Sequence, residues 1–182
     1  FDTADAITQQ TLLEANTPFE FIPTQPTQQA VILIHGLYDS PCIMQSLAPI
    51  FLEQNYLVRS LLLPGHGTCP EDLFDIGFED WLTACRHAIH LLPATIERIV
   101  IAGFSTGALA SHYLALNHEI PQLVGLISIA PALALHKIQQ TLLKHNPIVS
   151  FAKYLSPWYA DSKVFDYAKY TQYAINGAYQ VQ

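Results

Sequence analysis

The sequence predicts an α/β fold, with a mostly parallel sheet that is covered by helices on both faces. Short apolar runs rich in Val, Ile and Leu recur along residues 19–131, and most of them end at Gly or Pro, which is typical of strands buried on both faces. Segments with apolar residues at helical spacing lie between these runs, so strand and helix alternate. Hydrophobic residues make up 51% of the 182 residues and charged residues only 13%, which indicates large buried elements.

Strands and helices can be placed along this pattern. The run "FEFIP" alternates and is expected to form an edge strand, whereas the later runs are almost continuously apolar. Ser40 and Pro41 are a favourable pair to begin the first helix, in which Pro49 is expected to cause a bend. The expected strands are 19–23, 30–35, 56–62, 98–103 and 123–130, and the expected helices begin at 40, span 78–92 and span 106–118.

The strand pattern stops at about residue 132. The segment 132–182 is rich in Tyr and contains Pro147 and Pro157, which favours small helices over sheet. We therefore divide the chain into the N-terminal part of an α/β core, residues 1–131, and a helical segment, residues 132–182.

Charge and cysteine content exclude several classes of function. The net charge is −7 and no Lys/Arg cluster occurs, so binding to nucleic acid or to an anionic membrane surface is not expected. The uncharged run 99–118 is interrupted by Gly and polar residues, so no transmembrane segment is predicted. The three cysteines share no metal-ligand spacing and are expected to be buried free thiols. His87 and His90 are expected to lie on a solvated helix face, so neither metal nor cofactor is predicted.

Ser105 stands out within "IVIAGFSTGALA", residues 99–110, where a predicted strand passes into a predicted helix. A serine nucleophile needs a base and a place for the developing oxyanion. A tight turn at this position exposes Oγ and directs the helix N-terminus towards the reacting carbonyl, and it demands small neighbours, which Gly103 and Gly107 provide. The alternative is a tight turn with a purely structural role.

A second motif, "LIHGLYDS" at residues 33–40, strengthens the catalytic interpretation. His35 and Gly36 allow a sharp turn, after which the backbone N–H of Leu37 can point towards the same carbonyl. With the N–H of Thr106 it would complete an oxyanion hole, in which each donor is worth roughly 3 kcal/mol in the transition state. His35 and His66 are expected to support loop geometry and to transfer no proton.

The motifs "VILIHGLYDSP", "LLLPGHGT" and "IAGFSTGALA" resemble, in this order, the α/β-hydrolase superfamily and its carboxylesterase and monoacylglycerol-lipase-like branch. The resemblance covers residues 19–131. It implies that Ser105 is the nucleophile, that Leu37 and Thr106 are the oxyanion donors, and that the segment from 132 is a cap over an acyl pocket. The implied partner is a small ester with an apolar acyl group, and no cofactor is implied.

The resemblance also implies an acid and a histidine after the cap, and neither is identifiable in the chain. His112 and His118 belong to the helix that leads away from Ser105, and Asp161 and Asp166 have the character of cap surface. We therefore expect these residues to be part of a longer hydrolase, poorly soluble and nearly inactive alone. If the chain is active by itself, the base would be sought among His66, His136 and His145.

Two alternatives to an esterase remain open. One is a thioesterase or peptidase on the same fold, and the other is a non-catalytic binding protein that keeps the serine turn. The oligomeric state is left open by the sequence. The compartment is also open: the cytoplasm is the default, and export is the alternative because the chain begins at Phe1.

Overall fold

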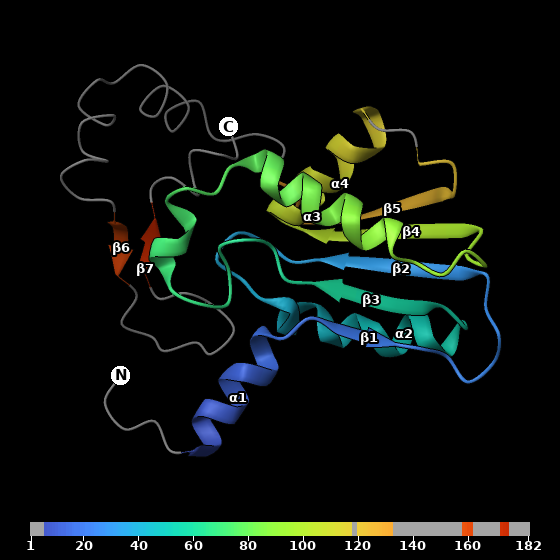
Figure 1. Ribbon diagram of the computed structural model, residues 1–182, viewed down its shortest axis with the longest axis horizontal. Coiled ribbons are helices and arrows are strands. Elements are labelled where there is room, and N and C mark those ends of the chain that lie inside the picture. Colours follow the sequence, from blue (N-terminus) through green and yellow to red (C-terminus); the bar gives the residue numbers. More distant parts are fainter. Residues whose placement is uncertain (1–5, 118–119, 133–157, 162–171, 175–182) are drawn as a thin grey trace.

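A five-stranded sheet forms the centre of the computed structural model, which describes residues 6–117, 120–132, 158–161 and 172–174. Its strand order is β1-β3-β2-β4-β5 (Figure 1), in which β1 is antiparallel to β3 and all other neighbours are parallel. The predicted strands and the predicted fold class are confirmed. The strands are β1 (Phe19–Phe21), β2 (Gln29–Ile34), β3 (Leu57–Leu61), β4 (Arg98–Phe104) and β5 (Leu123–Ile129).

The helices follow the prediction with some differences. The segment after Ser40 is split into a 3-10 helix and a short α-helix, because Pro49 falls in the first turn of the latter, where a missing N–H is harmless. Ser40 precedes this segment as predicted, but its side chain makes no capping hydrogen bond. The helices α1 and η2 were not predicted. The helical elements are α1 (Ala6–Asn16), η1 (Pro41–Leu47), α2 (Ala48–Glu53), η2 (Pro70–Leu73), α3 (Phe78–His90) and α4 (Thr106–Asn117).

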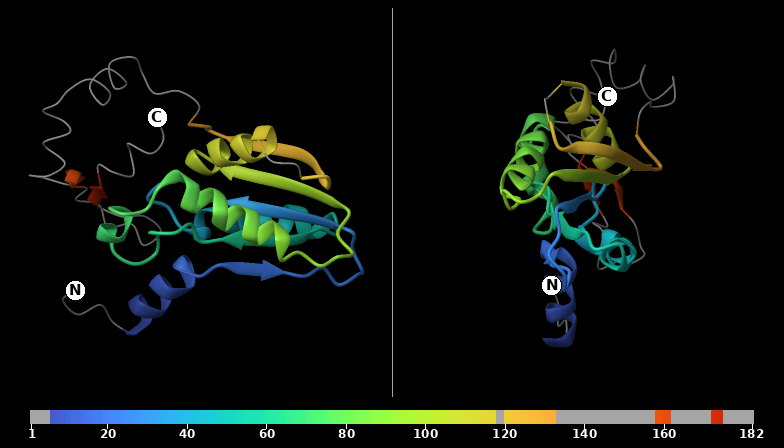
Figure 2. Two further views of the ribbon diagram at one scale, coloured as in Figure 1. Left: turned by 45° about the horizontal axis from the view of Figure 1, so that its top comes forward. Right: turned by 90° about the vertical axis from the view of Figure 1, so that its right-hand side faces the viewer.

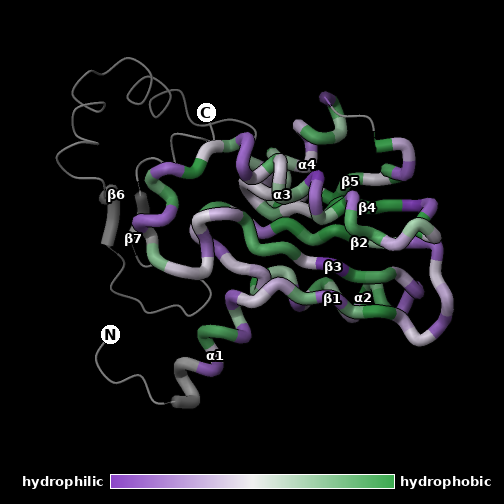
Figure 3. Tube along the Cα trace, in the orientation of Figure 1, coloured by the Kyte–Doolittle hydropathy of each residue, from purple (hydrophilic) through white to green (hydrophobic). Residues whose placement is uncertain are grey.

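Helices cover both faces of the sheet, and successive residues of β2 contribute to the two sides in turn. Ile32 and Ile34 belong to a core cluster that includes α3 and α4 residues, whereas Val31 and Leu33 pack in a second cluster with η1 and α2. Figure 2 shows α3 and α4 on one side of the sheet and α2 on the other. Hydrophobic residues run along the central strands β2 and β4 (Figure 3). The near-continuous apolar strands of the sequence therefore reflect burial on both faces.

The segment after residue 132 contains two short strands where none was predicted. β6 (Trp158–Asp161) and β7 (Gln172–Ala174) pair antiparallel in a sheet of their own. Adjacent aromatic residues in "WYAD" favour extended backbone, which explains why the expectation of small helices is wrong for these residues. The remainder of 133–182 lies outside the described residues. The helical cap and the division at residue 131 therefore stay predictions.

The cysteines are free thiols, but they are not all buried. Cys85 is buried in α3, Cys42 is half-buried, and Cys69 is exposed just before η2. The expectation of a buried thiol is therefore wrong for Cys69, which lies in a surface connection. Among the described helices, none combines the length and apolar character needed to span a bilayer.

Candidate active site

Ser105 occupies the turn that joins β4 to α4, and its backbone is in the left-handed region with φ 51°. A non-glycine residue there costs on the order of 1–3 kcal/mol and persists only when its surroundings hold it. Here the Ser105 N–H donates to the Ile129 carbonyl at 2.9 Å, and the Ser105 carbonyl accepts from the Ala108 N–H at 3.1 Å. The turn is thus fastened to the end of β5 and to the first turn of α4.

Two glycines permit this turn because α4 begins in direct contact with the strands. A Cβ at Gly103 would lie 2.5 Å from the Ala108 nitrogen and from the Gly107 carbonyl group. A Cβ at Gly107 would lie 2.5 Å from the His35 carbonyl oxygen. Both approaches are shorter than real Cβ contacts. The requirement for small residues on either side of Ser105 is therefore met by backbone-to-backbone packing.

The loop after β2 passes beside Ser105. Ile34 is paired with Gly103 at the ends of β2 and β4, and a Cβ at Gly36 would lie 3.2 Å from the Cβ of Ser105. Leu37 follows directly. Within the described part of the chain, neither the Leu37 N–H nor the Thr106 N–H donates a hydrogen bond. An oxyanion hole requires backbone donors of this kind, and these two lie on the residue after Ser105 and on the loop that packs against it.

Two buried histidines hold this loop: His35 begins it and His66 contacts it from the loop after β3. The His35 ring contacts the Gly36 carbonyl through Nδ1 at 2.8 Å, and its Nε2 accepts from the Leu63 N–H at 3.0 Å. Burial lowers the pKa of His35 to about 3 and that of His66 to about 4. Both rings are therefore neutral at ordinary pH and have both nitrogens engaged, so neither is suited to accept the Ser105 proton.

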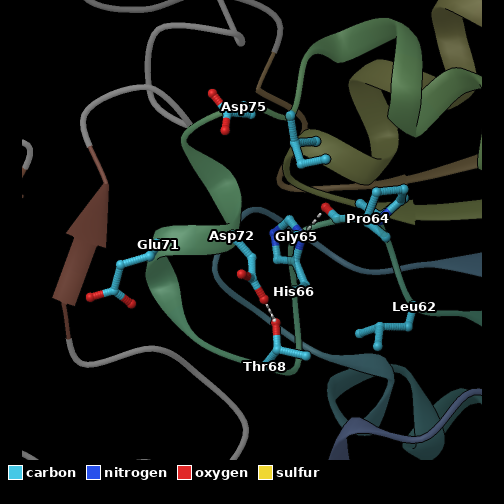
Figure 4. Close-up of a pocket in the computed structure, with 10 residues that line it drawn as sticks. Leu62, Pro64, Gly65, His66, Thr68, Glu71, Asp72 and Asp75 are labelled. Atoms are coloured by element: carbon cyan, nitrogen blue, oxygen red, sulfur yellow. Dashed lines mark hydrogen bonds between the residues drawn. The ribbon is translucent and has the colours of Figure 1, made fainter.

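His66 also borders a cavity of about 560 Å³ at the end of β3 (Figure 4). In the close-up its Nδ1 faces the Pro64 carbonyl, 3.1 Å away, and the Thr68 hydroxyl donates to Asp72. This hydrogen bond holds the pKa of Asp72 below its usual value. Ser105 is not among the described residues that line the cavity.

Seven of the predicted residues meet at the carboxyl ends of β2 and β4. No described side chain hydrogen-bonds the Ser105 hydroxyl. His112 contacts the Ser128 hydroxyl at 2.8 Å, on the exposed side of α4 and β5. The seven residues are His35, Gly36, Leu37, Gly103, Ser105, Thr106 and Gly107.

The other predicted candidates are not brought to this site by the described structure. His87 and His90 are exposed on α3, and no group of three potential metal ligands occurs among the described residues. Asp161 ends β6, and its side chain is not described. His118, His136, His145 and Asp166 lie outside the described residues.

Sequence reasoning missed the link between His66 and the loop that holds Leu37. The His66 Nε2 accepts a hydrogen bond from the Tyr38 N–H at 3.1 Å, across a separation of 28 residues. It also missed Asp39, whose buried carboxylate lies 2.7 Å from the position of a Cβ on Gly36. The sequence offered one indication of this link: each of two predicted strands is followed by a His-Gly pair, at His35 and at His66.

Comparison with known families agrees with this geometry. The family model described as "Serine aminopeptidase, S33" (Hydrolase_4) matches residues 25–175. The chain belongs to this family. The α/β-hydrolase fold and the superfamily inferred from the motifs are thereby confirmed.

Curated relatives of this S33-family chain include two Bacillus enzymes. It is 32% identical over 102 residues to the thermostable monoacylglycerol lipase of Bacillus sp. (strain H-257), covering 56% of this chain and 40% of that protein. It is 27% identical over 137 residues to a carboxylesterase of Bacillus subtilis (strain 168), covering 75% of this chain and 52% of that one. The chain thus spans about half the length of these relatives.

Solved structures share the fold of the S33-family chain at low identity. A structure described in a report on the metagenome-derived lipolytic enzymes LipS and LipT has a TM-score of 0.76 and 20% identity, covering 92% of this chain and 66% of that one. The monoacylglycerol lipase of Paleococcus ferrophilus has a TM-score of 0.62 and 17% identity, covering 91% and 68%.

Proposed function

We propose that this chain carries the nucleophile of a serine hydrolase that cleaves carboxylic esters. The observation that carries the proposal is the left-handed Ser105 at the head of α4, with the loop of Gly36 and Leu37 packed against it. The relatives named as a monoacylglycerol lipase and a carboxylesterase support ester chemistry.

In the proposed reaction, the Ser105 Oγ attacks the ester carbonyl as its proton passes to a base, which we do not assign. The Leu37 and Thr106 N–H groups donate to the carbonyl oxygen as it becomes negative. The C–O bond to the alcohol then breaks, and the alcohol leaves with a proton. Water adds to the resulting acyl-Ser105 and releases the carboxylic acid, which restores the hydroxyl.

The proposed substrate is a small, uncharged ester with an apolar acyl group. The chain is unusually apolar, with a charged fraction of 13%, and a lipase and an esterase are among its relatives. The family description as a serine aminopeptidase favours one rival, cleavage of an aminoacyl amide. A panel of p-nitrophenyl esters, acyl thioesters and aminoacyl amides separates these reactions, because all three share the acyl-enzyme but differ in the leaving group.

The decisive experiment is to treat the full-length gene product that carries this sequence with a fluorophosphonate and to measure its intact mass. We expect one adduct, located on Ser105 by peptide mapping. Ser105→Ala should abolish it, whereas Ser128→Ala, at an exposed serine on β5, should leave it unchanged. A folded wild-type protein without an adduct would instead indicate a binding protein that keeps the serine turn.

A further inference from the structure

Two loops at the carboxyl edge of the sheet are joined reciprocally by the buried histidines. One loop follows β2 and contains His35 and Tyr38, and the other follows β3 and contains Leu63 and His66. His35 accepts the Leu63 N–H at 3.0 Å, and His66 accepts the Tyr38 N–H at 3.1 Å. Each ring therefore accepts a backbone N–H from the opposite loop, so neither loop can move away from the other without breaking these hydrogen bonds, of which the one to His35 is buried.

These contacts fix the proton on each ring. Because Nε2 accepts from a backbone N–H in both rings, it carries no proton, and in a neutral imidazole the proton must then be on Nδ1. The Nδ1 of His35 faces the Gly36 carbonyl at 2.8 Å, and that of His66 faces the Pro64 carbonyl at 3.1 Å. The low pKa values of both rings are consistent with this neutral form.

We propose that His35 and His66 are positioning residues of the oxyanion hole, which hold two successive peptide groups so that the Leu37 N–H faces Ser105. The inference rests on the proposed function. The Gly36 carbonyl and the Leu37 N–H belong to one trans peptide group and therefore point in opposite directions. By binding the Gly36 oxygen, together with the Asp39 N–H at 3.3 Å, His35 sets the direction of the Leu37 N–H.

His66 holds the next peptide group, between Leu37 and Tyr38. Tyr38 has φ 64°, a left-handed conformation that costs a non-glycine residue on the order of 1–3 kcal/mol. The acceptor that His66 offers to the Tyr38 N–H helps to maintain this conformation. Without this acceptor the peptide group between Leu37 and Tyr38 should be able to rotate. The preceding peptide group, which carries the Leu37 N–H, would then lose its alignment with Ser105.

The rival explanation is packing alone. The rings of His35 and His66 are 5.0 Å apart in an edge-to-face arrangement, and the Trp81 ring lies 5.9 Å from that of His66. If the histidines served only to fill space, activity would follow stability regardless of which ring nitrogen was replaced. The hydrogen-bond proposal predicts a different outcome, because the two rings hold the Leu37 loop through different nitrogens. His35 binds the Gly36 carbonyl through Nδ1, whereas His66 accepts the Tyr38 N–H through Nε2.

Amide side chains test this difference, since Asn places a polar group near the Nδ1 position and Gln near the Nε2 position. His35→Asn keeps a donor for the Gly36 carbonyl, and His66→Gln keeps an acceptor for the Tyr38 N–H, so both should retain kcat within about tenfold. His35→Gln and His66→Asn lose these bonds and should lower kcat on the order of 100-fold with little change in KM. Assays would use a p-nitrophenyl ester and the full-length gene product.

Trp81→Phe is the control for destabilisation, because it removes the indole bond to the Pro64 carbonyl while leaving both histidine links. It should lower the melting temperature without a comparable loss of kcat. If instead activity followed melting temperature across all five variants, without the crossed pattern, the proposal would be overturned in favour of packing.

A spectroscopic measurement keeps the proposal testable if some variants do not fold. Long-range ¹H–¹⁵N NMR of the wild-type protein at pH 7 should show both rings as neutral Nδ1–H tautomers. A protonated ring, or an Nε2–H tautomer at either position, would refute the proposal. This result does not depend on turnover: absence of a Ser105 adduct would reject the proposed function and leave the tautomer measurement intact.

Discussion

At the scale of single residues, the strained Ser105 is held by neighbours that lack a side chain. Gly103 and Gly107 let backbone meet backbone, and Gly36 brings the next loop against Ser105. Close backbone packing thus offsets the conformational energy of the left-handed serine, and an added methyl group at these glycines would disturb that packing. Substitutions of these glycines should therefore cost stability first and activity as a consequence.

The first prediction compares two glycines. Gly107→Ala should lower the free energy of unfolding by about 1–3 kcal/mol or more, because its Cβ would overlap the carbonyl oxygens of Ile34 and His35. Gly125→Ala in β5 is the matched control, since its Cβ would meet only the Val100 side chain, 3.8 Å away. Urea denaturation measures both. Equal losses from the two substitutions would contradict the close packing at Gly107.

The second prediction concerns Leu37, whose proposed contribution is its backbone N–H. Leu37→Ala keeps that donor, so kcat/KM should stay within about tenfold of the wild type, whereas Ser105→Ala should abolish acyl-enzyme formation. Ester hydrolysis and fluorophosphonate labelling provide the two readouts. Comparable losses from both substitutions would mean that the Leu37 side chain shapes the pocket.

At the scale of elements, local patterns predicted those segments whose burial repeats regularly. The strands were predictable because both faces of β2 and β4 are covered, and α3 because its apolar residues recur at helical spacing. Pro49 predicted a bend in the segment after Ser40 but not its division into η1 and α2. The strand β6 was not predicted, since short segments carry too few residues to show a period.

The third prediction uses Cys85 as a reporter of α3 docking. Burial raises the pKa of its thiol to about 12, so roughly one molecule in ten thousand carries a thiolate at pH 8. A thiol reagent should modify the exposed Cys69 in the folded protein, although its pKa is raised, and should modify Cys85 only on unfolding. Cys69→Ser should remove that modification and leave Cys85 protected, with any remaining reaction mapped to the half-buried Cys42. Rapid modification of Cys85 in the folded protein would show that α3 detaches readily from the sheet.

At the scale of the whole molecule, the sequence could predict which residues form the serine turn but not how its surroundings hold it. Ser105, Thr106 and Leu37 follow strands that lie side by side, so a correct strand order is sufficient to bring them together. The bonds of His35 and His66 join residues 28 positions apart in the sequence, and their direction depends on ring orientation, which no local pattern encodes.

The fourth prediction is a loss of stability in mild acid. The pKa of His35 is lowered to about 3 and that of His66 to about 4, against 6.5 for an exposed ring, so below pH 6.5 the unfolded chain binds protons that the folded protein resists. The contribution of the two neutral rings to the free energy of unfolding is therefore fully present above pH 6.5. It is lost as the pH falls towards 4, by up to about 1.4 kcal/mol per pH unit for each ring.

The proximity of the two rings acts in the same direction. His35 and His66 face each other, which further disfavours charge on His35. The pKa of Asp72 is lowered below 3.8, chiefly by the Thr68 bond, so Asp72 contributes nothing to the change between pH 7 and pH 5. Urea denaturation at pH 7, 6 and 5 measures the effect, and His66→Gln should make the pH dependence shallower. A free energy of unfolding that stays constant from pH 7 to pH 5 would contradict the prediction.

The reciprocal bonds between the two loops also bear on inheritance and on protein engineering. If residues 35–38 were grafted into another scaffold without residues 63–66, they would lack the hydrogen-bond partners that orient their peptide groups. Both loops would therefore have to be transferred together. In diverging descendants, replacement of His66 by a residue that cannot accept a hydrogen bond should be accompanied by a compensating change around residue 38. Substitutions in the two loops are thus expected to be correlated, although the loops are encoded by separate parts of the gene.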